Sequence, residues 1–369
     1  MLLYLAEALR DEFSSLNIIR YVSFRVMAGF ITSFVVCLAV YPWFIKALQS
    51  KSVNQPIRED GPKSHFSKAG TPTMGGALII LSIMLSSVLW ADIKNILVIF
   101  TLIIGLFFSV IGLVDDLKKL KSGSSKGLSV KFRLCIELAF VAVAVFMFLK
   151  YFGPKLHFDT RLYVPFVSVE KFWLDIGIPL YVALGTLLIV GIANAVNLTD
   201  GLDGLASGPV LTSAGTLLIF AYITGAKLGT FDVSKYLLIP KVVGAQELSV
   251  VASCIMGATL GFLYYNAYPA EIFQGDTGSL GLGAMLASIA FLTKNELLSL
   301  IPFGIFVFEA FSVITQTTYY KLTKKRIFPM SPIHHSFELL GWPEPKIVVR
   351  FWIVSLLLAF VALASIKVR

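Results

Sequence analysis

The stretch ILVIFTLIIGLFFSVIGLVDDLKK, residues 96–119, joins an apolar run to two adjacent aspartates. Residues 96–114 contain no charged side chain. A run of this length, folded as an α-helix, crosses about 30 Å of hydrocarbon. The sequence therefore predicts a transmembrane helix that delivers Asp115 and Asp116 to the membrane boundary.

The composition places the whole chain in the membrane class. Its 369 residues are 57% hydrophobic and 14% charged, with a mean hydropathy of +0.82, whereas soluble proteins carry about 25% charged residues. Basic loops facing lipid headgroups explain the net charge of +9, so no nucleic-acid partner is expected. The three cysteines lie in apolar runs without the spacing of a zinc or redox site.

Apolar segments long enough, or nearly long enough, to cross a bilayer recur along the chain. They predict an all-α integral membrane protein, a bundle of about ten transmembrane helices. Because no internal repeat or linker separates them, residues 1–369 are expected to form a single polytopic domain. The predicted spans lie near residues 22–45, 74–91, 96–114, 134–152, 176–196, 204–225, 247–268, 280–293, 297–320 and 348–366.

Residues 1–20 lack the basic region and cleavage site of a signal peptide. Their apolar and charged residues, among them Glu7, Asp11 and Glu12, fall at helical spacing. They predict a short helix lying at the membrane interface before the first span.

Basic residues indicate the orientation of the bundle. They concentrate after the first, third and ninth spans, which predicts that these loops are cytoplasmic and that both termini face outward. The bias is incomplete because outward segments also contain lysines and arginines. The basic residues of the three loops are Lys46, Lys51, Arg58, Lys63, Lys68, Lys118, Lys119, Lys121, Lys126, Lys131, Arg133, Lys321, Lys324, Lys325, Arg326, Lys346 and Arg350.

Polar clusters follow the third, fifth, seventh and ninth spans. Because successive spans alternate in direction, all four clusters should reach the cytoplasmic face and share one active site. The expected catalytic loops lie near 46–73, 115–133, 197–207, 266–279 and 321–347. The clustered residues are Asp115, Asp116, Asn194, Asn197, Asp200, Asp203, Asn266, Glu271, Asp276, His334 and His335.

The adjacent carboxyl groups of Asp115 and Asp116 suggest a cation site. Two like charges at the carboxyl end of a helix are unfavourable unless a cation or a basic partner compensates them. Mg²⁺ suits this position because it binds through one or two carboxylates together with substrate phosphates. The alternative is a solvated turn at a helix end.

Two further segments, NLTDGLDGL at 197–205 and QGDTGSLGLG at 274–283, combine acids with glycines. Glycine lets the backbone approach a ligand closely, and Asp276 stands just ahead of an expected helix start, where phosphate or a cation can bind. Alternatively, the glycines form turns, and Asp200, Asp203 or Asp276 caps the following helix.

His334 and His335, two of the four histidines in the chain, lie in one loop. Imidazole can hold a pyrophosphate or move a proton, although loop histidines are often structural. The segment KAGTPTMGG, residues 68–76, adds Lys68 and Thr73 at the same face. Lys68 either neutralises phosphate or serves only the charge bias of the loop.

Together, FSKAGTPTMGG, GLVDDLKK, NLTDGLDGL, FQGDTGSL and FPMSPIHHSFELLGWPEPKIVVRFW resemble the polyprenyl-phosphate N-acetylhexosamine-1-phosphate transferase superfamily. TPTMGG and the PIHH loop followed by GWPE are most similar to its bacterial phospho-N-acetylmuramoyl-pentapeptide transferase family. The resemblance, which covers nearly the whole chain, implies that undecaprenyl phosphate attacks the β-phosphate of UDP-N-acetylmuramoyl-pentapeptide and releases UMP. It also implies Mg²⁺ as cofactor, the bacterial cytoplasmic membrane as location, and a homodimer.

The resemblance implies a role for each matched residue. Asp276 is the principal metal ligand, and Asp115 and Asp116 handle the lipid phosphate and its proton. The uridine nucleotide is contacted by Asn197 and Asp200. His334 belongs with the three aspartates to the catalytic positions, and it matches a basic position that holds phosphate. The remaining substrate-binding positions are Lys68, Thr73, Lys131 and His335.

One departure from the family is Ser336, where a third histidine usually follows PIHH, so a third imidazole is not essential here. Ser336 alone favours the nearest alternative, a transferase of phospho-N-acetylglucosamine or another amino sugar to a polyprenyl phosphate. A membrane transporter is a remote alternative. Transporters carry charged residues near the midplane, whereas the mid-span charges of this chain are few and its carboxylates cluster at one boundary. The clearest mid-span charge is Glu309, for which the sequence indicates no partner.

Overall fold

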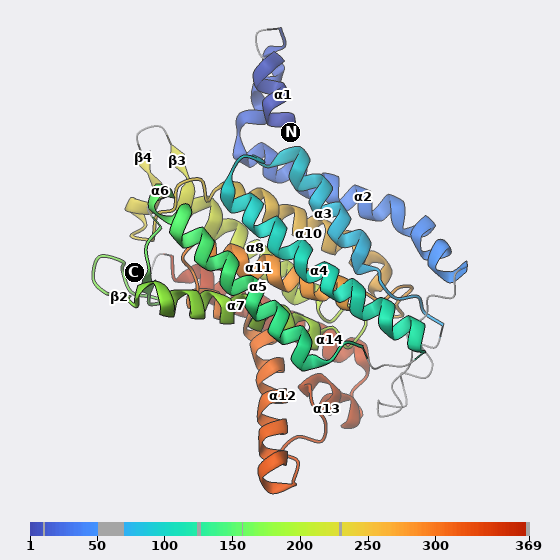
Figure 1. Ribbon diagram of the computed structural model, residues 1–369. Coiled ribbons are helices and arrows are strands. Elements are labelled where there is room, and N and C mark those ends of the chain that lie inside the picture. The colour runs from blue at the N-terminus through green and yellow to red at the C-terminus, as the bar shows by residue number, and fades with distance from the viewer. Residues whose placement is uncertain (10–11, 51–69, 124–126, 157, 229–230, 367–369) are drawn as a thin grey trace.

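The computed structural model describes residues 1–9, 12–50, 70–123, 127–156, 158–228 and 231–366. Helices dominate the fold (Figure 1). Its α-helices are α1 (Leu2–Leu9), α2 (Val22–Ser50), α3 (Gly76–Trp90), α4 (Ile96–Ser122), α5 (Val130–Tyr151), α6 (Gly153–Leu156), α7 (Gly177–Thr199), α8 (Ser207–Gly225), α9 (Val233–Tyr236), α10 (Glu247–Asn266), α11 (Gly275–Leu292), α12 (Gly304–Thr323), α13 (Ile333–Leu339) and α14 (Glu344–Ala364). Two short antiparallel hairpins pair β1 (Arg161–Tyr163) with β2 (Trp173–Asp175), and β3 (Lys227–Leu228) with β4 (Phe231–Asp232).

The prediction of an all-α membrane protein is confirmed. Each of the ten predicted spans contains a helix, and eight helices of the described chain are long and apolar enough to cross a bilayer. α3 is apolar but shorter, with 15 residues, and α12 is not among the eight. The eight are α2, α4, α5, α7, α8, α10, α11 and α14.

Among the differences from the sequence prediction, one concerns the aspartate pair and another concerns the N-terminal segment. The third predicted span ends at residue 114, but α4 continues to Ser122, because a helix can extend beyond the hydrocarbon into water. Asp115 and Asp116 therefore lie inside a helix and not at its end. Within residues 1–20, the structure has α1 and a separate 3₁₀ helix, Ser14–Arg20, in place of one helix.

α11 forms the centre of the bundle. All its residues from Thr277 to Leu292 are buried, and it packs against α3, α4, α7 and α8. Close approach depends on small residues: a Cβ at Gly278 would lie 2.6 Å from Gly76 Cα, and one at Gly283 would lie 2.7 Å from Ala193 Cα. Such contacts are typical of helix packing in membranes.

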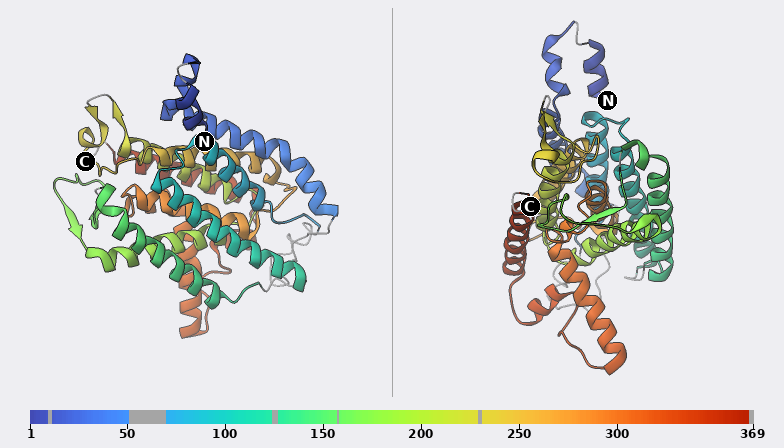
Figure 2. Two further views of the ribbon diagram at one scale, coloured as in Figure 1. Left: turned by 45° about the horizontal axis from the view of Figure 1, so that its top comes forward. Right: turned by 90° about the vertical axis from the view of Figure 1, so that its left-hand side faces the viewer.

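α12 and α13 extend away from the bundle on one side (Figures 1 and 2). Apolar side chains of α12, including Phe311, Ile314 and Leu322, are exposed. In a membrane these side chains face lipid or another apolar partner, because exposure to water would be unfavourable. α12 also packs on α7.

A buried ion pair joins α2 to α10 where α10 begins. Arg25 and Glu247 form two parallel contacts of 2.6 Å between guanidinium nitrogens and carboxylate oxygens. Arg25 also donates to Trp90 O at 3.1 Å, and Glu247 accepts from Asp92 N at 2.9 Å. The pair connects three helices at a point where bidentate geometry compensates both charges.

Glu247→Gln should lower the stability of the protein by about 3–5 kcal/mol, because it leaves the Arg25 guanidinium buried without a counter-charge. Thermal unfolding in detergent measures the effect. Glu12→Gln, which changes an exposed carboxylate, is the matched control and should leave the transition in place. Equal transitions for all three proteins would contradict the prediction.

Candidate active site

The carboxylate of Asp116 joins α4 to the start of α11. Its Oδ1 accepts a hydrogen bond from Asp276 N at 3.1 Å, and its Oδ2 accepts from Thr277 N at 3.0 Å and Thr277 Oγ1 at 2.7 Å. The backbone donors belong to the first turn of α11, where amide groups lack partners within the helix and favour an anion. Asp116 thus caps α11, and the alternative in which Asp276 caps its own helix does not hold.

Glycines allow this close approach. A Cβ at Gly112 would lie 2.3 Å from Asp276 O, and one at Gly275 would lie 2.8 Å from Asp116 Oδ2. Gly275 also has a φ of +74°, which residues with a Cβ rarely adopt. Gly112 and Gly275 therefore bring the two acidic motifs into contact.

Lys119 bridges the carboxylates of Asp115 and Asp276. Its Nζ lies 2.7 Å from Asp115 Oδ2 and 3.0 Å from Asp276 Oδ2. The sequence prediction places Lys119 in a loop because it ends the helix at residue 114, whereas the structure places Lys119 within α4. In the longer α4 it stands four positions after Asp115, a spacing that places the two side chains on the same face.

Arg133 on α5 is a second cation at Asp276. Its Nη1 lies 3.2 Å from Asp276 Oδ2, and its Nη2 donates to Asn194 Oδ1 at 3.1 Å. Asn194 Nδ2 in turn donates to Glu137 Oε2 at 2.7 Å, which connects α5 to α7. Lys131, the basic residue expected at the substrate, is exposed on the first turn of α5. Two residues along a helix rotate a side chain by about 200°, so Arg133 and Lys131 face different directions.

The segment before α5 folds over Asp115. Asp115 Oδ1 accepts from Leu128 N at 2.5 Å, and a Cβ at Gly127 would lie 2.3 Å from both carboxylate oxygens. Since Lys119 contacts Oδ2, each oxygen of this buried carboxylate has a donor. The charge of Asp115 is therefore compensated at both of its oxygens.

The segment before α3 pairs with the segment before α11. Phe273 N donates to Pro72 O, and Gly75 N donates to Phe273 O, both at 2.8 Å. Thr73 lies between these bonds and is buried. The structure thus places Thr73 beside the start of α11, while Lys68 lies outside the described residues.

The turn between α7 and α8 contributes an unusual acid. Burial raises the pKa of the Asp200 carboxyl to about 8, and the carboxylates of Asp276, Asp116 and Asp203 add to the rise. A carboxyl group with this pKa is mostly protonated at pH 7 and can donate a hydrogen bond. Asp200 is therefore suited to contact an oxygen of a substrate.

Asp203 in the same turn forms a hydrogen bond to another segment of the chain. Its Oδ2 accepts from Ala270 N at 3.0 Å, which ties the turn to the segment that follows α10. The N-cap of α8 is Ala206, so neither Asp200 nor Asp203 caps that helix. Asn197, half-buried on the last turn of α7, precedes the turn by three residues.

The loop that leads to α13 is fixed by the serine found in place of a third histidine. Ser336 Oγ donates to Met330 O at 2.5 Å and accepts from Met330 N at 3.2 Å. His335 Nδ1 lies 2.7 Å from Glu338 Oε2 on the same helix. His334 is fully buried with its ring centroid 4.2 Å from that of His335.

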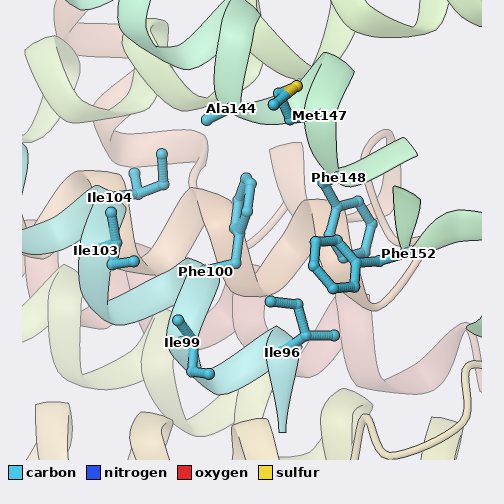
Figure 3. A pocket seen from close by; sticks show the side chains of 9 residues that line it. All are labelled: Ile96, Ile99, Phe100, Ile103, Ile104, Ala144, Met147, Phe148 and Phe152. Carbon is cyan, nitrogen blue, oxygen red and sulfur yellow. The ribbon is translucent and has the colours of Figure 1, made fainter. Parts of the chain in front are cut away.

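An apolar groove runs along the seam of α4 and α5 (Figure 3). It ends at Ile104, about 16 Å along the helix from Asp115, and so does not adjoin the aspartate pair. Phe107 stacks on Phe140 with ring centroids 3.6 Å apart, between the groove and the acids. The groove is lined by Ile96, Ile99, Phe100, Ile103, Ile104, Ala144, Met147, Phe148 and Phe152.

The sequence of this region matches a known class of membrane enzymes. Residues 96–294 match glycosyl transferase family 4. This segment runs from α4 to the end of α11 and includes Asp115, Asp116 and Asp276. Residues 68–80 match a signature of phospho-N-acetylmuramoyl-pentapeptide-transferase. The chain is therefore a polytopic membrane protein of glycosyl transferase family 4.

Full-length relatives define the family more narrowly. The chain is 49% identical to the phospho-N-acetylmuramoyl-pentapeptide-transferase of Sorangium cellulosum (strain So ce56) over 96% of each chain. It is 47% and 48% identical, over the whole of both chains, to the enzymes of that name from Syntrophus aciditrophicus (strain SB) and Geobacter sp. (strain M21). The protein belongs to the phospho-N-acetylmuramoyl-pentapeptide-transferase family, which confirms the resemblance and leaves no support for a transporter.

Proposed function

We propose that the protein transfers phospho-N-acetylmuramoyl-pentapeptide from its UDP-linked precursor to undecaprenyl phosphate. The products are UMP and the lipid I intermediate of peptidoglycan synthesis. The observation that carries the proposal is the meeting of Asp115, Asp116 and Asp276 between α4 and α11, in a chain nearly half identical to the named transferases over their full length.

The site should face the cytoplasm of a bacterial inner membrane. Its cations are Lys119 near the end of α4 and Arg133 near the start of α5, and basic residues cluster again at the end of α12. Such clusters favour the cytoplasmic side. A water-soluble nucleotide sugar would then reach the acids from the cytoplasm.

The acceptor should reach the same acids from the membrane. Val114 and Leu117 flank the aspartate pair on α4, and both side chains are exposed. Apolar side chains at this position can contact the prenyl chain, while the phosphate lies against the polar groups of the site. A polyprenyl phosphate therefore fits the boundary between lipid-facing and charged surfaces of α4.

A magnesium ion is compatible with the residues present. Asp115 and Asp276 both contact a single cation, the Lys119 ammonium, so two carboxylates can share one positive ion. Mg²⁺ would complete its shell with substrate phosphates and water. Asp276 would be the principal ligand, and the bound ion would neutralise charge on the reacting phosphates.

The reaction requires charge neutralisation and in-line positioning more than a protein nucleophile. We propose direct attack by an oxygen of the lipid phosphate on the β-phosphorus of the precursor. The new P–O bond forms as the bond from this phosphorus to the bridging oxygen breaks, and UMP leaves. Asp115 accepts the proton of the lipid phosphate when that group arrives protonated, while Lys119 and Arg133 stabilise anionic oxygens.

The test is release of UMP by the purified protein in detergent. We expect release that requires both UDP-N-acetylmuramoyl-pentapeptide and undecaprenyl phosphate, and that stops when a chelator removes Mg²⁺ and resumes when it is restored. Asp232→Asn, an acid of the remote β3–β4 hairpin, should retain the activity of the unmodified chain. Release only with UDP-N-acetylglucosamine would move the protein to the alternative donor, and no release with any nucleotide sugar would overturn the proposal.

A further inference from the structure

Glu309 and His334 form a buried pair that the reaction described so far does not use. Glu309 lies on α12 and His334 begins the histidine pair of α13, 25 positions later. Glu309 Oε1 lies 3.1 Å from His334 Nδ1, and both side chains are fully buried. A carboxylate in such surroundings is costly unless a polar partner compensates it. Among the described residues, His334 is the hydrogen-bond partner of the Glu309 carboxyl group.

The other ring nitrogen of His334 is directed at the turn between α7 and α8. A Cβ at Gly201 would lie 2.3 Å from His334 Nε2, so only glycine leaves room for this nitrogen. Nε2 is buried and has no hydrogen-bond partner among the described residues. Gly201 follows Asp200, the acid expected at the nucleotide. Nε2 thus faces the segment where the substrate should lie, with its bonding capacity unused.

The other charged groups near this pair have partners elsewhere. His335, on the same helix, pairs with Glu338. On α14, Glu344 Oε1 accepts from Asp203 N at 2.7 Å. Arg350 of α14 lies over the Trp342 ring at 4.2 Å. The contact to His334 Nδ1 therefore comes from Glu309.

We propose that Glu309 is a positioning residue for the transfer reaction: it keeps a proton on His334 Nδ1 and holds the unprotonated Nε2, as a hydrogen-bond acceptor, toward the nucleotide sugar. A carboxylate beside Nδ1 accepts its hydrogen bond, so it fixes both the tautomer and the rotation of the ring. Carboxylate–imidazole pairs act in this way when the opposite nitrogen contacts a reacting group. The inference rests on the proposed function, because it gives Nε2 a hydroxyl or N–H donor of that substrate as partner.

Steady-state kinetics with Glu309→Ala, Glu309→Gln and His334→Ala test the coupling. Glu309→Ala should lower kcat/KM for the nucleotide sugar by about 10²-fold, while the KM for undecaprenyl phosphate stays within about twofold. Glu309→Gln should lose less, about tenfold, because its amide oxygen still accepts from Nδ1. In the His334→Ala background, neither substitution should reduce activity by more than about twofold.

Imidazole ¹⁵N resonances give a readout that a purely structural role would not move. The chain has four histidines, so subtraction of the His334→Ala spectrum identifies the two nitrogens of His334. In the unmodified protein the proton should reside on Nδ1, and in Glu309→Ala it should be shared with Nε2. Glu247→Gln, which neutralises a different buried carboxylate at the remote end of α10, should leave this signal unchanged.

The outcomes separate the two proposals. If the unmodified chain is active, and Glu309→Ala loses as much activity without His334 as with it, the positioning role is wrong. An unchanged Nδ1 signal in Glu309→Ala would overturn it equally. If the unmodified chain releases no UMP from any donor, the proposed function fails, whereas the spectra still decide whether Glu309 sets the tautomer.

Discussion

Asp276→Asn should reduce UMP release at least about 10³-fold, equivalent to about 4 kcal/mol of transition-state stabilisation. Asp276 Oδ2 is the point where Lys119 and Arg133 converge, and it is the proposed principal ligand for Mg²⁺. An amide at this position keeps the shape of the side chain but removes the negative charge that organises both cations and the metal. The first turn of α11 should persist, because its cap is Asp116.

The measurement is the initial rate of UMP release at several Mg²⁺ concentrations. Asp232→Asn supplies the matched loss of a carboxylate at the remote hairpin. Thermal unfolding separates a loss of chemistry from a loss of folded protein, since Asp276→Asn should unfold near the temperature of the unmodified chain. Full activity of Asp276→Asn at the lowest effective Mg²⁺ concentration would remove Asp276 from the proposed metal site.

Asp115→Asn should reduce turnover by about 10²–10⁴-fold, the usual contribution of a positioned acid or base. The amide oxygen can still accept from Leu128 N, so the segment over α4 should remain folded. It cannot accept the proton of the lipid phosphate, and it no longer balances the Lys119 ammonium, which lies 2.7 Å from the carboxylate. The effect should therefore fall on turnover more than on folding.

Turnover of Asp115→Asn should be measured with saturating undecaprenyl phosphate, so that weaker acceptor binding does not imitate slower chemistry. Leu117→Ala on the exposed side of the same helix is a useful comparison, because it trims the apolar surface offered to the prenyl chain. It should raise the KM for the lipid and leave turnover nearly unchanged. Asp115→Asn with turnover above half that of the unmodified chain would exclude a role for Asp115 in proton transfer.

Hydropathy predicts the membrane helices because the bilayer demands length and apolarity of each span. It does not predict where a helix ends in water, which is why the expected boundary at residue 114 falls short of Ser122. With the helix expected to end at residue 114, the sequence could not predict that Lys119 lies on the same helical face as Asp115. Composition also describes α12 poorly, since its buried polar residues Glu309 and Gln316 have partners that hydropathy cannot identify.

The sequence motifs identify the acids of the site but not the contacts that these acids make. Asp115, Asp116 and Asp276 are recognisable from GLVDD and QGDTG, and the structure places them together. The choice between Lys131 and Arg133 depends on the rotation of α5, which two neighbouring basic residues in a sequence do not reveal. Glu309 and His334 meet only through the packing of α12 on α13, so spacing along the chain carries no sign of their contact.

The ion pair between Arg25 and Glu247 also bears on how the protein is made. Its partners are 222 positions apart, so at about 5–20 residues/s a ribosome adds Glu247 roughly 10–45 s after Arg25. During that interval α2 must enter the bilayer with an unpaired guanidinium. Arg25 lies close to the first residue of α2, where its side chain can reach the headgroups. Closure of the pair is thus a late event of biogenesis, available only after α10 has been inserted.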